Sequence, residues 1–166
     1  MNTQNTNWGQ SVAAVVIRED RVLLARHTYG GGKGLLIIPG GYVEHGETPQ
    51  EAVIRELKEE TGVMIEPREI IGIRFNMHDW YTVFRGQYIS GEARSDSDEN
   101  DEVLWLPVEQ ALSRDDVPQL TKSLIQSALS GRGLEALDYA GGNPPCSLYG
   151  FAENGKDAAE QQRPYK

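Results

Sequence analysis

Three glutamates, Glu56, Glu59 and Glu60, recur at spacings of three and four residues in one acidic run. On an α-helix these spacings make side chains neighbours, and like charges there destabilise the helix by a few tenths of a kcal/mol per pair. Carboxylate oxygens suit hard divalent cations, and no His or Cys accompanies them, so the cluster favours Mg²⁺ or Mn²⁺ over zinc. The alternative is a solvated acidic face balanced by Arg55 and Lys58.

The helix that would carry these glutamates has clear limits in the sequence. Thr48 followed by Glu51 forms a capping box, Pro49 takes the first helical position, and Gly62 supplies a left-handed stop. We therefore predict a helix from Pro49 to Thr61. Helical periodicity separates two faces, one with Ala52, Glu56, Glu59 and Glu60, and the other with Val53, Ile54, Leu57 and Thr61. The first face is predicted to carry chemistry and the second to join the core.

Residues 41–63 as a whole resemble the signature of the Nudix hydrolases, G-x5-E-x7-R-E-U-x-E-E-x-G-U, in which U is aliphatic. Every defined position is met, by Gly41, Glu47, Arg55, Glu56, Leu57, Glu59, Glu60, Gly62 and Val63. The resemblance covers about residues 11–130. It implies an α/β fold, the Nudix-type α/β/α sandwich with a mixed central sheet, and an enzyme that uses Mg²⁺ or Mn²⁺.

The resemblance also implies roles for individual residues. Metal ligands would be Glu56, Glu59 and Glu60, the main-chain carbonyl of Gly40 and, in a secondary or orienting role, Glu47. Arg55 would brace a carboxylate. Family members draw the general base from the motif helix or from an acidic residue in a later loop. Glu102, just ahead of a strand containing Trp105, is our first candidate from such a loop and Glu99 is the second; either could instead be a metal ligand or a surface charge.

The net charge of −9 is concentrated in two segments. Residues 41–63 carry a net charge of −4 and residues 92–102 carry −5, whereas acids and bases balance in the rest of the chain. Binding to nucleic acid requires clustered Lys and Arg to neutralise phosphates, so we expect no nucleic-acid partner. The second segment is typical of a solvated loop. Beside an acidic helix, the alternative is that both segments face one cation.

The surrounding sequence predicts the elements that position this site. Residues 11–17 and 22–25 form a predicted hairpin, and a Gly-rich loop (30–34) leads to a strand at 35–38 that residues 39–41 are expected to break. Further strands are predicted at 69–76, 81–90 and 102–106, with a turn at 77–80, and helices at 107–113 and 119–129. In the last helix Leu120, Leu124 and Ala128 share one apolar face, flanked by Ile125 and Leu129. A mixed sheet between helices is the economical packing.

Four side chains near the predicted site are candidate substrate contacts. Lys33 in the Gly-rich loop, Arg26 at a strand end and His45 in the motif loop could each meet a phosphate, although all three are also typical of solvent-exposed residues. Tyr81 follows the motif at a distance similar to that of a Tyr in Nudix enzymes acting on diadenosine polyphosphates; aromatic residues in strands are more often core. Where some ADP-ribose pyrophosphatases carry a proline, this chain has Asp79.

Composition indicates the class of protein, its cellular location and its division into domains. The chain has 166 residues, of which 39% are hydrophobic and 25% charged, values ordinary for a soluble globular protein. With one cysteine, Cys146, and no signal-peptide or membrane-spanning pattern, we expect a cytoplasmic protein without membrane contact. We predict one Nudix domain at 1–130 and a Gly/Pro-rich extension at 131–166. Its apolar side chains, Tyr139, Leu148, Tyr149 and Phe151, would pin it to the domain or to a homodimer partner.

These observations lead to one functional hypothesis and one alternative. The hypothesis is a hydrolase that cleaves a pyrophosphate linkage in a nucleoside diphosphate derivative, such as a nucleoside triphosphate, nucleotide sugar or dinucleoside polyphosphate, by attack of a metal-activated water on phosphorus. The alternative is a Nudix module that binds or senses a nucleotide without turnover. Because every motif carboxylate is present, we favour the enzyme.

Overall fold

The computed structural model describes residues 9–139 and 146–151. In chain order the elements are β1 Gly9–Arg18, β2 Arg21–His27, the 3-10 helix η1 Gly30–Gly32, β3 Leu36–Ile37, β4 Gly40–Tyr42, α1 Pro49–Thr61, β5 Met64–Phe75, β6 Asp79–Ser90, β7 Asn100–Pro107, α2 Val108–Ser113, α3 Gln119–Leu129, β8 Glu135–Ala136 and β9 Tyr149–Gly150. The predicted α1 and α3 limits agree with these bounds, and α2 begins one residue later than predicted.

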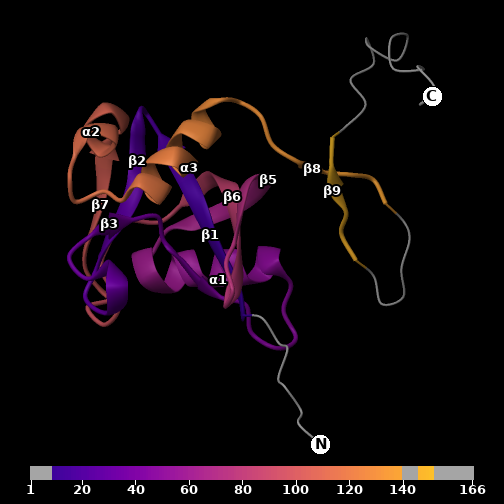
Figure 1. Cartoon of the computed structure of the whole chain (residues 1–166), viewed down its shortest axis with the longest axis horizontal. Helices are drawn as coiled ribbons and strands as arrows, with labels where there is room; N and C mark the ends of the chain where they lie inside the picture. The colour runs from indigo at the N-terminus through magenta and orange to yellow at the C-terminus, as the bar shows by residue number, and fades with distance from the viewer. Residues whose placement is uncertain (1–8, 140–145, 152–166) are drawn as a thin grey trace, which may run out of the picture.

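Strands β1 to β7 form one mixed sheet in which β1 is central, and β8 pairs with β9 in a separate two-stranded sheet. The order is β3-β2-β1-β6-β5, with β4 also paired to β1 and β7 to β2. Only the β1–β6 pair is parallel; the other pairs in this sheet are antiparallel. Figure 1 shows the sheet between α1 on one face and α2 with α3 on the other. The predicted α/β/α sandwich with a mixed sheet is confirmed.

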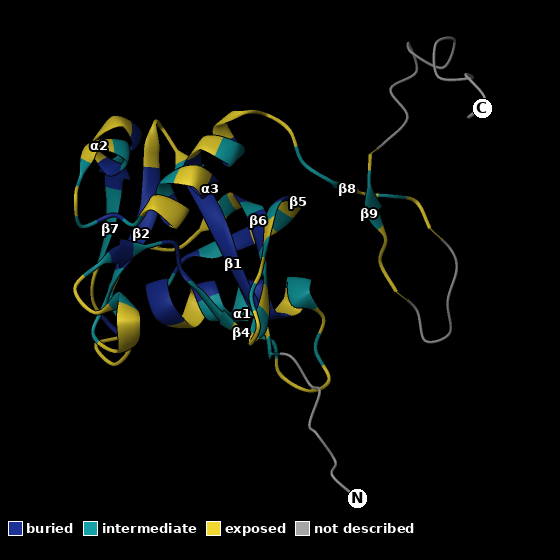
Figure 2. Cartoon of the chain, viewed as in Figure 1, coloured by how far each residue is buried: buried dark blue, intermediate teal, exposed yellow. Residues whose placement is uncertain are grey.

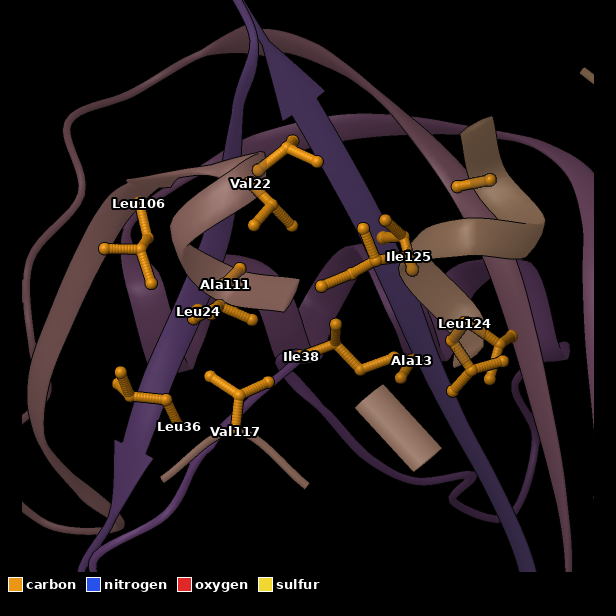
Figure 3. Packing of buried hydrophobic residues seen from close by; sticks show 14 of the residues in the cluster. Ala13, Val22, Leu24, Leu36, Ile38, Leu106, Ala111, Val117, Leu124 and Ile125 are labelled. Carbon is orange, nitrogen blue, oxygen red and sulfur yellow. The ribbon is translucent and has the colours of Figure 1, made fainter. Parts of the chain in front are cut away.

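The core consists of two apolar layers, one on each face of this sheet. Successive residues of β1 alternate between them: Ala13 and Val15 face α2 and α3, whereas Val12, Ala14 and Val16 face α1. Figure 3 shows the first layer, where side chains of β1 and β2 meet those of α2 and α3. Figure 2 shows that β1 and β2 are buried along most of their length. Because helices cover both faces of the sheet, side chains on both faces of these strands are buried, which explains their continuous apolar sequences.

The predicted hairpin is confirmed, with a two-residue turn. Glu19 and Asp20 link β1 to β2 with φ values of 49° and 63°. Such turns match the twist of antiparallel strands and usually carry Asn or Gly. The acidic pair gave no clear signal of this turn type.

The strand predicted at 35–38 ends before residues 40 and 41 as expected, because β3 ends at Ile37, but Gly40 and Gly41 then begin a further strand that was not predicted. Gly40 and Gly41 lie in β4 and pair with Ala13 and Val12 of β1. A Cβ at Gly40 would overlap the Val12 carbonyl and the Ala13 backbone. Glycine permits this close approach, so the Gly-Gly pair lies in a strand.

The β5–β6 hairpin also differs from prediction at both ends. β5 begins at Met64 rather than at residue 69, because register shifts between residues 64 and 72 interrupt the alternating pattern without ending the ladder. The turn is shorter than predicted, since Asp79 and Trp80 already belong to β6. Asn76 Oδ1 stabilises the turn by accepting the His78 and Asp79 backbone N–H groups at 2.6 and 2.7 Å.

The buried face of α3 is rotated from the predicted one. Thr121, Leu124, Ile125 and Ala128 are buried, whereas Leu120 and Leu129 are exposed. Leu124 fits against Gly72, where a Cβ would come within 2.8 Å of its Cδ2. Within the described ranges, no helix has the length and apolar content needed to cross a membrane.

Contacts of the extension with the domain include a backbone pair and a ring contact. Leu134 pairs with Ile70 of β5, and the Tyr149 ring packs 5.9 Å from that of Phe84. Of the predicted anchors, Tyr139, Leu148 and Phe151 are exposed. The division of the chain into 1–130 and 131–166 and the homodimer contact stay predictions; a chain ending at Ser130 that remained dimeric in light scattering would contradict the second.

Candidate active site

The acidic helix α1 begins and ends as its sequence predicts. The Thr48 side chain accepts the Glu51 backbone N–H, and the Glu51 side chain accepts the Thr48 N–H, which completes the capping box. Gly62 adopts the left-handed conformation with φ of 72°, and its N–H donates to the Lys58 carbonyl. These caps hold the last turn, which carries Glu59 and Glu60, at a fixed place beside the sheet.

The three glutamates of α1 differ sharply in burial, which their spacing alone did not show. Glu60 is 2% exposed, the Glu56 side chain 14% and the Glu59 side chain 63%. Ala52, which helical periodicity placed on the chemical face, is buried, and Ile54 is only partly buried. Neighbours in sequence lie about 100° apart on a helix, so Glu60 points at the sheet while Glu59 points to solvent.

Strand β4 approaches α1 closely because two glycines line it. The Gly40 N–H donates to Glu60 Oε2 at 3.0 Å. A Cβ at Gly41 would overlap the Glu56 carboxylate, so any side chain there would displace it. The signature glycine therefore has a steric role in this chain: it leaves room for a carboxylate. The Gly40 carbonyl as a metal ligand stays a prediction.

Glu60 is a buried carboxyl group with an incomplete set of partners. Its Oε1 atom is buried and has no hydrogen-bond partner. Burial raises the pKa of Glu60 to about 8, with further upward effects from the charges of Glu56 and Glu99 and a downward effect from the Gly40 N–H. Burial also raises the pKa of Glu56. A nearby cation would favour the charged form of both groups.

Arg55 connects the remaining motif carboxylates. Its guanidinium donates to Glu47 through Nε at 3.1 Å and Nη2 at 2.6 Å, and through Nη1 to Glu56 at 2.9 Å and Glu59 at 3.4 Å. It also donates to the Tyr42 carbonyl at 3.1 Å. The Glu47 hydrogen bonds are the largest cause of the raised pKa of Arg55. Arg55 thus braces carboxylates, the role that the resemblance implies.

Glu99 of the acidic loop, residues 92–99, lies next to the helix glutamates. Its negative charge contributes to the raised pKa values of Glu56 and Glu60, and its carboxylate is hydrogen-bonded by the Tyr29 hydroxyl. Its backbone carbonyl accepts the Thr28 N–H at 3.1 Å and the Thr28 hydroxyl at 3.0 Å. The structure therefore brings Glu99 to the helix cluster, so the two acidic segments do meet.

Glu102, our first candidate for a general base outside the motif, does not join that cluster. It pairs with Arg26 across β2 and β7, and Arg26 Nε donates to Glu102 at 2.8 Å. Leu104, two residues on, packs in the layer that faces α2 and α3. Side chains two apart in a strand share a face, so Glu102 points to the face opposite α1. The predicted proximity of Glu102 to the helix glutamates is therefore wrong.

The candidate substrate contacts are scattered. Arg26 is engaged by Glu102, by Asp116 at 3.1 Å and by the Gly34 carbonyl at 2.8 Å. Lys33 and His45 are exposed on their loops. Tyr81 packs against the α3 layer with the Arg74 guanidinium 5.3 Å from its ring centroid. Contact of these residues with a substrate stays a prediction, and for Arg26 it would require giving up an existing partner.

The donor set fits a hard divalent cation in its chemistry. In residues 9–139 and 146–151 no group of three or more His, Cys, Asp and Glu side chains is arranged to hold a metal ion. Arg55 instead occupies the centre of the motif carboxylates. The unpartnered Glu60 Oε1 and the half-buried Glu56 carboxylate are nevertheless oxygen donors of the kind that Mg²⁺ and Mn²⁺ take.

Comparison with known proteins agrees with this geometry. A sequence profile described as the NUDIX domain matches residues 8–127. This chain belongs to the NUDIX domain family. The NUDIX domain of this chain thus includes every helix and strand described above from β1 up to most of α3.

Individual relatives and structures match to different extents. A MutT-like protein of Streptomyces ambofaciens is 37% identical over 133 residues, 79% of this chain and 78% of that protein. An ADP-ribose pyrophosphatase of Methanocaldococcus jannaschii is 38% identical over 63 residues, which span only 38% of this chain and 37% of that protein. A NUDIX hydrolase from Nitrosomonas europaea superposes with a TM-score of 0.70 at 24% identity, over 80% of this chain and 97% of that chain. The structural likeness shows the NUDIX fold.

Several residues of the site were not found from the sequence. Thr28 and Tyr29 hold the acidic loop, Asp96 accepts backbone N–H groups within it, and Asn100 anchors it to α1. They carry no motif and no periodic signal. The only hint was the polar Asn100 at the edge of an apolar strand.

Proposed function

We propose that this NUDIX protein is a divalent-metal-dependent hydrolase that cleaves a pyrophosphate linkage in a nucleoside diphosphate derivative. The observation that carries the proposal is the buried, partly unpartnered Glu60 carboxyl, grouped with Glu56 and Glu99 beside a glycine-lined strand. Such crowding of carboxyl groups is unfavourable without a cation. The family membership and the relatives named as hydrolases of such linkages support the same reaction class.

We assign separate roles to the residues of the site. When bound, Mg²⁺ or Mn²⁺ would neutralise phosphate charge and acidify a water molecule. Glu56, Glu59 and Glu60 would hold the cation, with Glu47 linked to them through Arg55. Arg55 keeps Glu56 and Glu59 oriented by charge-assisted hydrogen bonds. Glu99, hydrogen-bonded to Tyr29, is the carboxylate outside the motif that we propose as a proton acceptor or further ligand.

The variant Glu59→Gln tests the proposal without disturbing the core, since this side chain is 63% exposed. We expect hydrolysis to fall by roughly 10²-fold or more. Nucleoside triphosphates, ADP-ribose, NADH and dinucleoside polyphosphates would be assayed with Mg²⁺ for released phosphate or pyrophosphate. Glu109→Gln, an exposed acid on α2, is the matched control. Unchanged hydrolysis in Glu59→Gln would contradict the metal-ligand assignment, and nucleotide binding without turnover by the wild type would favour the sensing module.

A further inference from the structure

Asn100 is a buried polar residue of β7 that the proposed mechanism does not use. It is 1% exposed, and its Nδ2 donates to the Glu60 backbone carbonyl at 3.0 Å. Its Oδ1 atom is buried without a hydrogen-bond partner. Burying an amide group with an unsatisfied hydrogen-bonding atom costs free energy. Its contact with Glu60, the most buried glutamate of α1, therefore requires an explanation.

The Asn100 side chain faces α1 because of a β-bulge. Glu102 pairs with Arg26, but Asn100 pairs with His27, so β7 has one extra residue at this point. Without it, Asn100 would share the face of Glu102 and Leu104, opposite α1. Bulges re-aim side chains in this way. The bulge therefore turns both Asn100 and the preceding loop toward the acidic helix.

The loop and the helix are joined at two consecutive carbonyls. The last carbonyl groups of an α-helix lack partners within the helix. Here the Glu60 carbonyl is taken by the Asn100 side chain and the Thr61 carbonyl by the Arg94 N–H at 2.9 Å. Residues 94 and 100 thus hold both ends of the segment that contains Glu99 against the last turn of α1.

Hydrogen bonds also connect residues within the segment between these two ends. Asp96 Oδ1 accepts the N–H groups of residues 98, 99 and 100 at 3.0–3.3 Å. The Ser95 hydroxyl donates to the Asn100 carbonyl at 2.6 Å. We therefore expect a displacement of Asn100 to move Glu99 as well.

We propose that Asn100 is a positioning residue of this site. Its hydrogen bond to the Glu60 carbonyl fixes the distance between the Glu99 carboxylate and the glutamates of α1. Asn100 does not touch substrate or cation; it acts through Glu99. The inference rests on the proposed function and deepens it, because it states how the second acidic segment is held at the cation site.

Asn100→Leu tests this role, since leucine has a similar volume and cannot donate a hydrogen bond. We expect kcat to fall about 10-fold or more, with a smaller change in KM, and Mg²⁺ binding measured by calorimetry to weaken roughly 10-fold. In a Glu99→Gln background, Asn100→Leu should lower kcat no further. Asn76→Ala, which removes an asparagine that stabilises the β5–β6 turn, is the control for lost stability and should leave Mg²⁺ binding and kcat unchanged.

Two results would overturn the proposal. One is an Asn100→Leu protein with a lower melting temperature but wild-type Mg²⁺ binding and kcat. The other is a further fall in kcat when Asn100→Leu is added to Glu99→Gln, because independent effects multiply. If the wild type hydrolyses none of the substrates, the proposed function fails, and Mg²⁺ calorimetry on both proteins still decides the role of Asn100.

Discussion

At the scale of single residues, burial distinguishes glutamates that sequence spacing makes equivalent. Glu60 lies within the fold with one oxygen held by Gly40 and the other unpartnered, whereas the Glu59 side chain is exposed and contacts Arg55 at 3.4 Å. A buried carboxylate lacking a cation is unfavourable, which is why burial raises the pKa of Glu60 to about 8. The two carboxyl groups therefore differ in environment, Glu60 being buried and Glu59 exposed.

The signature glycine gives a residue-scale prediction. In Gly41→Ala the new Cβ would occupy the place of the Glu56 carboxylate, so Glu56 must move away from Glu60. We expect hydrolysis to fall about 10²-fold or more, because a donor is displaced. Steady-state kinetics at saturating Mg²⁺ measures this. Gly31→Ala, at a position open to solvent with no close neighbour, is the matched control; equal activities of the two variants would contradict the steric role.

At the scale of elements, ion pairs connect β2 to the segment between α2 and α3, on the face of the sheet opposite α1. Asp116, between α2 and α3, accepts from Arg114 at 2.7 Å and from Arg26 of β2 at 3.1 Å. Its backbone carbonyl accepts the Leu36 N–H of β3 at 2.8 Å. This network links β2, β3 and the α2–α3 connection, and Arg26 is one of its members.

The network predicts a pH dependence of stability. The Arg114 hydrogen bonds, followed by that of Arg26, lower the pKa of Asp116 below its ordinary value of 3.8. A depressed carboxyl pKa stabilises the fold above the unfolded-state pKa, and this contribution is lost as the pH falls through the folded-state pKa. The free energy of unfolding of the wild type should therefore exceed that of Asp116→Asn at pH 6, by a gap that narrows toward pH 3. Urea unfolding at several pH values measures it; a constant gap would contradict the assignment.

At the scale of the whole molecule, the sheet brings together segments that lie far apart in the chain. β1 pairs with β2, β4 and β6, and β7 pairs with β2. The ends of β2, β4 and α1 therefore meet the start of β7 at one site. The C-terminal extension also contacts the domain, at β6 and at α1. Tyr149 packs on Phe84 of β6, and the Gln50 side chain of α1 donates to Ser147 at 2.7 Å.

The extension gives a prediction about global stability. Tyr149→Ala removes a half-buried ring from the α1 layer and should lower the free energy of unfolding by roughly 1–2 kcal/mol. Phe151→Ala removes a ring that is 81% exposed and should change it by no more than about 0.5 kcal/mol. Thermal and urea unfolding of the two variants compares them. Equal effects would show that the Tyr149 contact does not anchor the extension in solution.

The sequence by itself determined the local features, because their causes are local. The capping box, Gly62 and the apolar period predicted α1, and two short apolar runs separated by a charged turn predicted the β1–β2 hairpin. The motif spacing pointed to Glu56, Glu59 and Glu60, and the family resemblance implied that Arg55 braces a carboxylate. The tertiary structure decided what depends on register: β4 as a strand, the burial of Glu60, and the position of Glu99 near the helix glutamates while Glu102 pairs with Arg26. One extra residue at the β7 bulge reverses which side chains face α1, and a period of two read along the chain cannot show where such a residue lies.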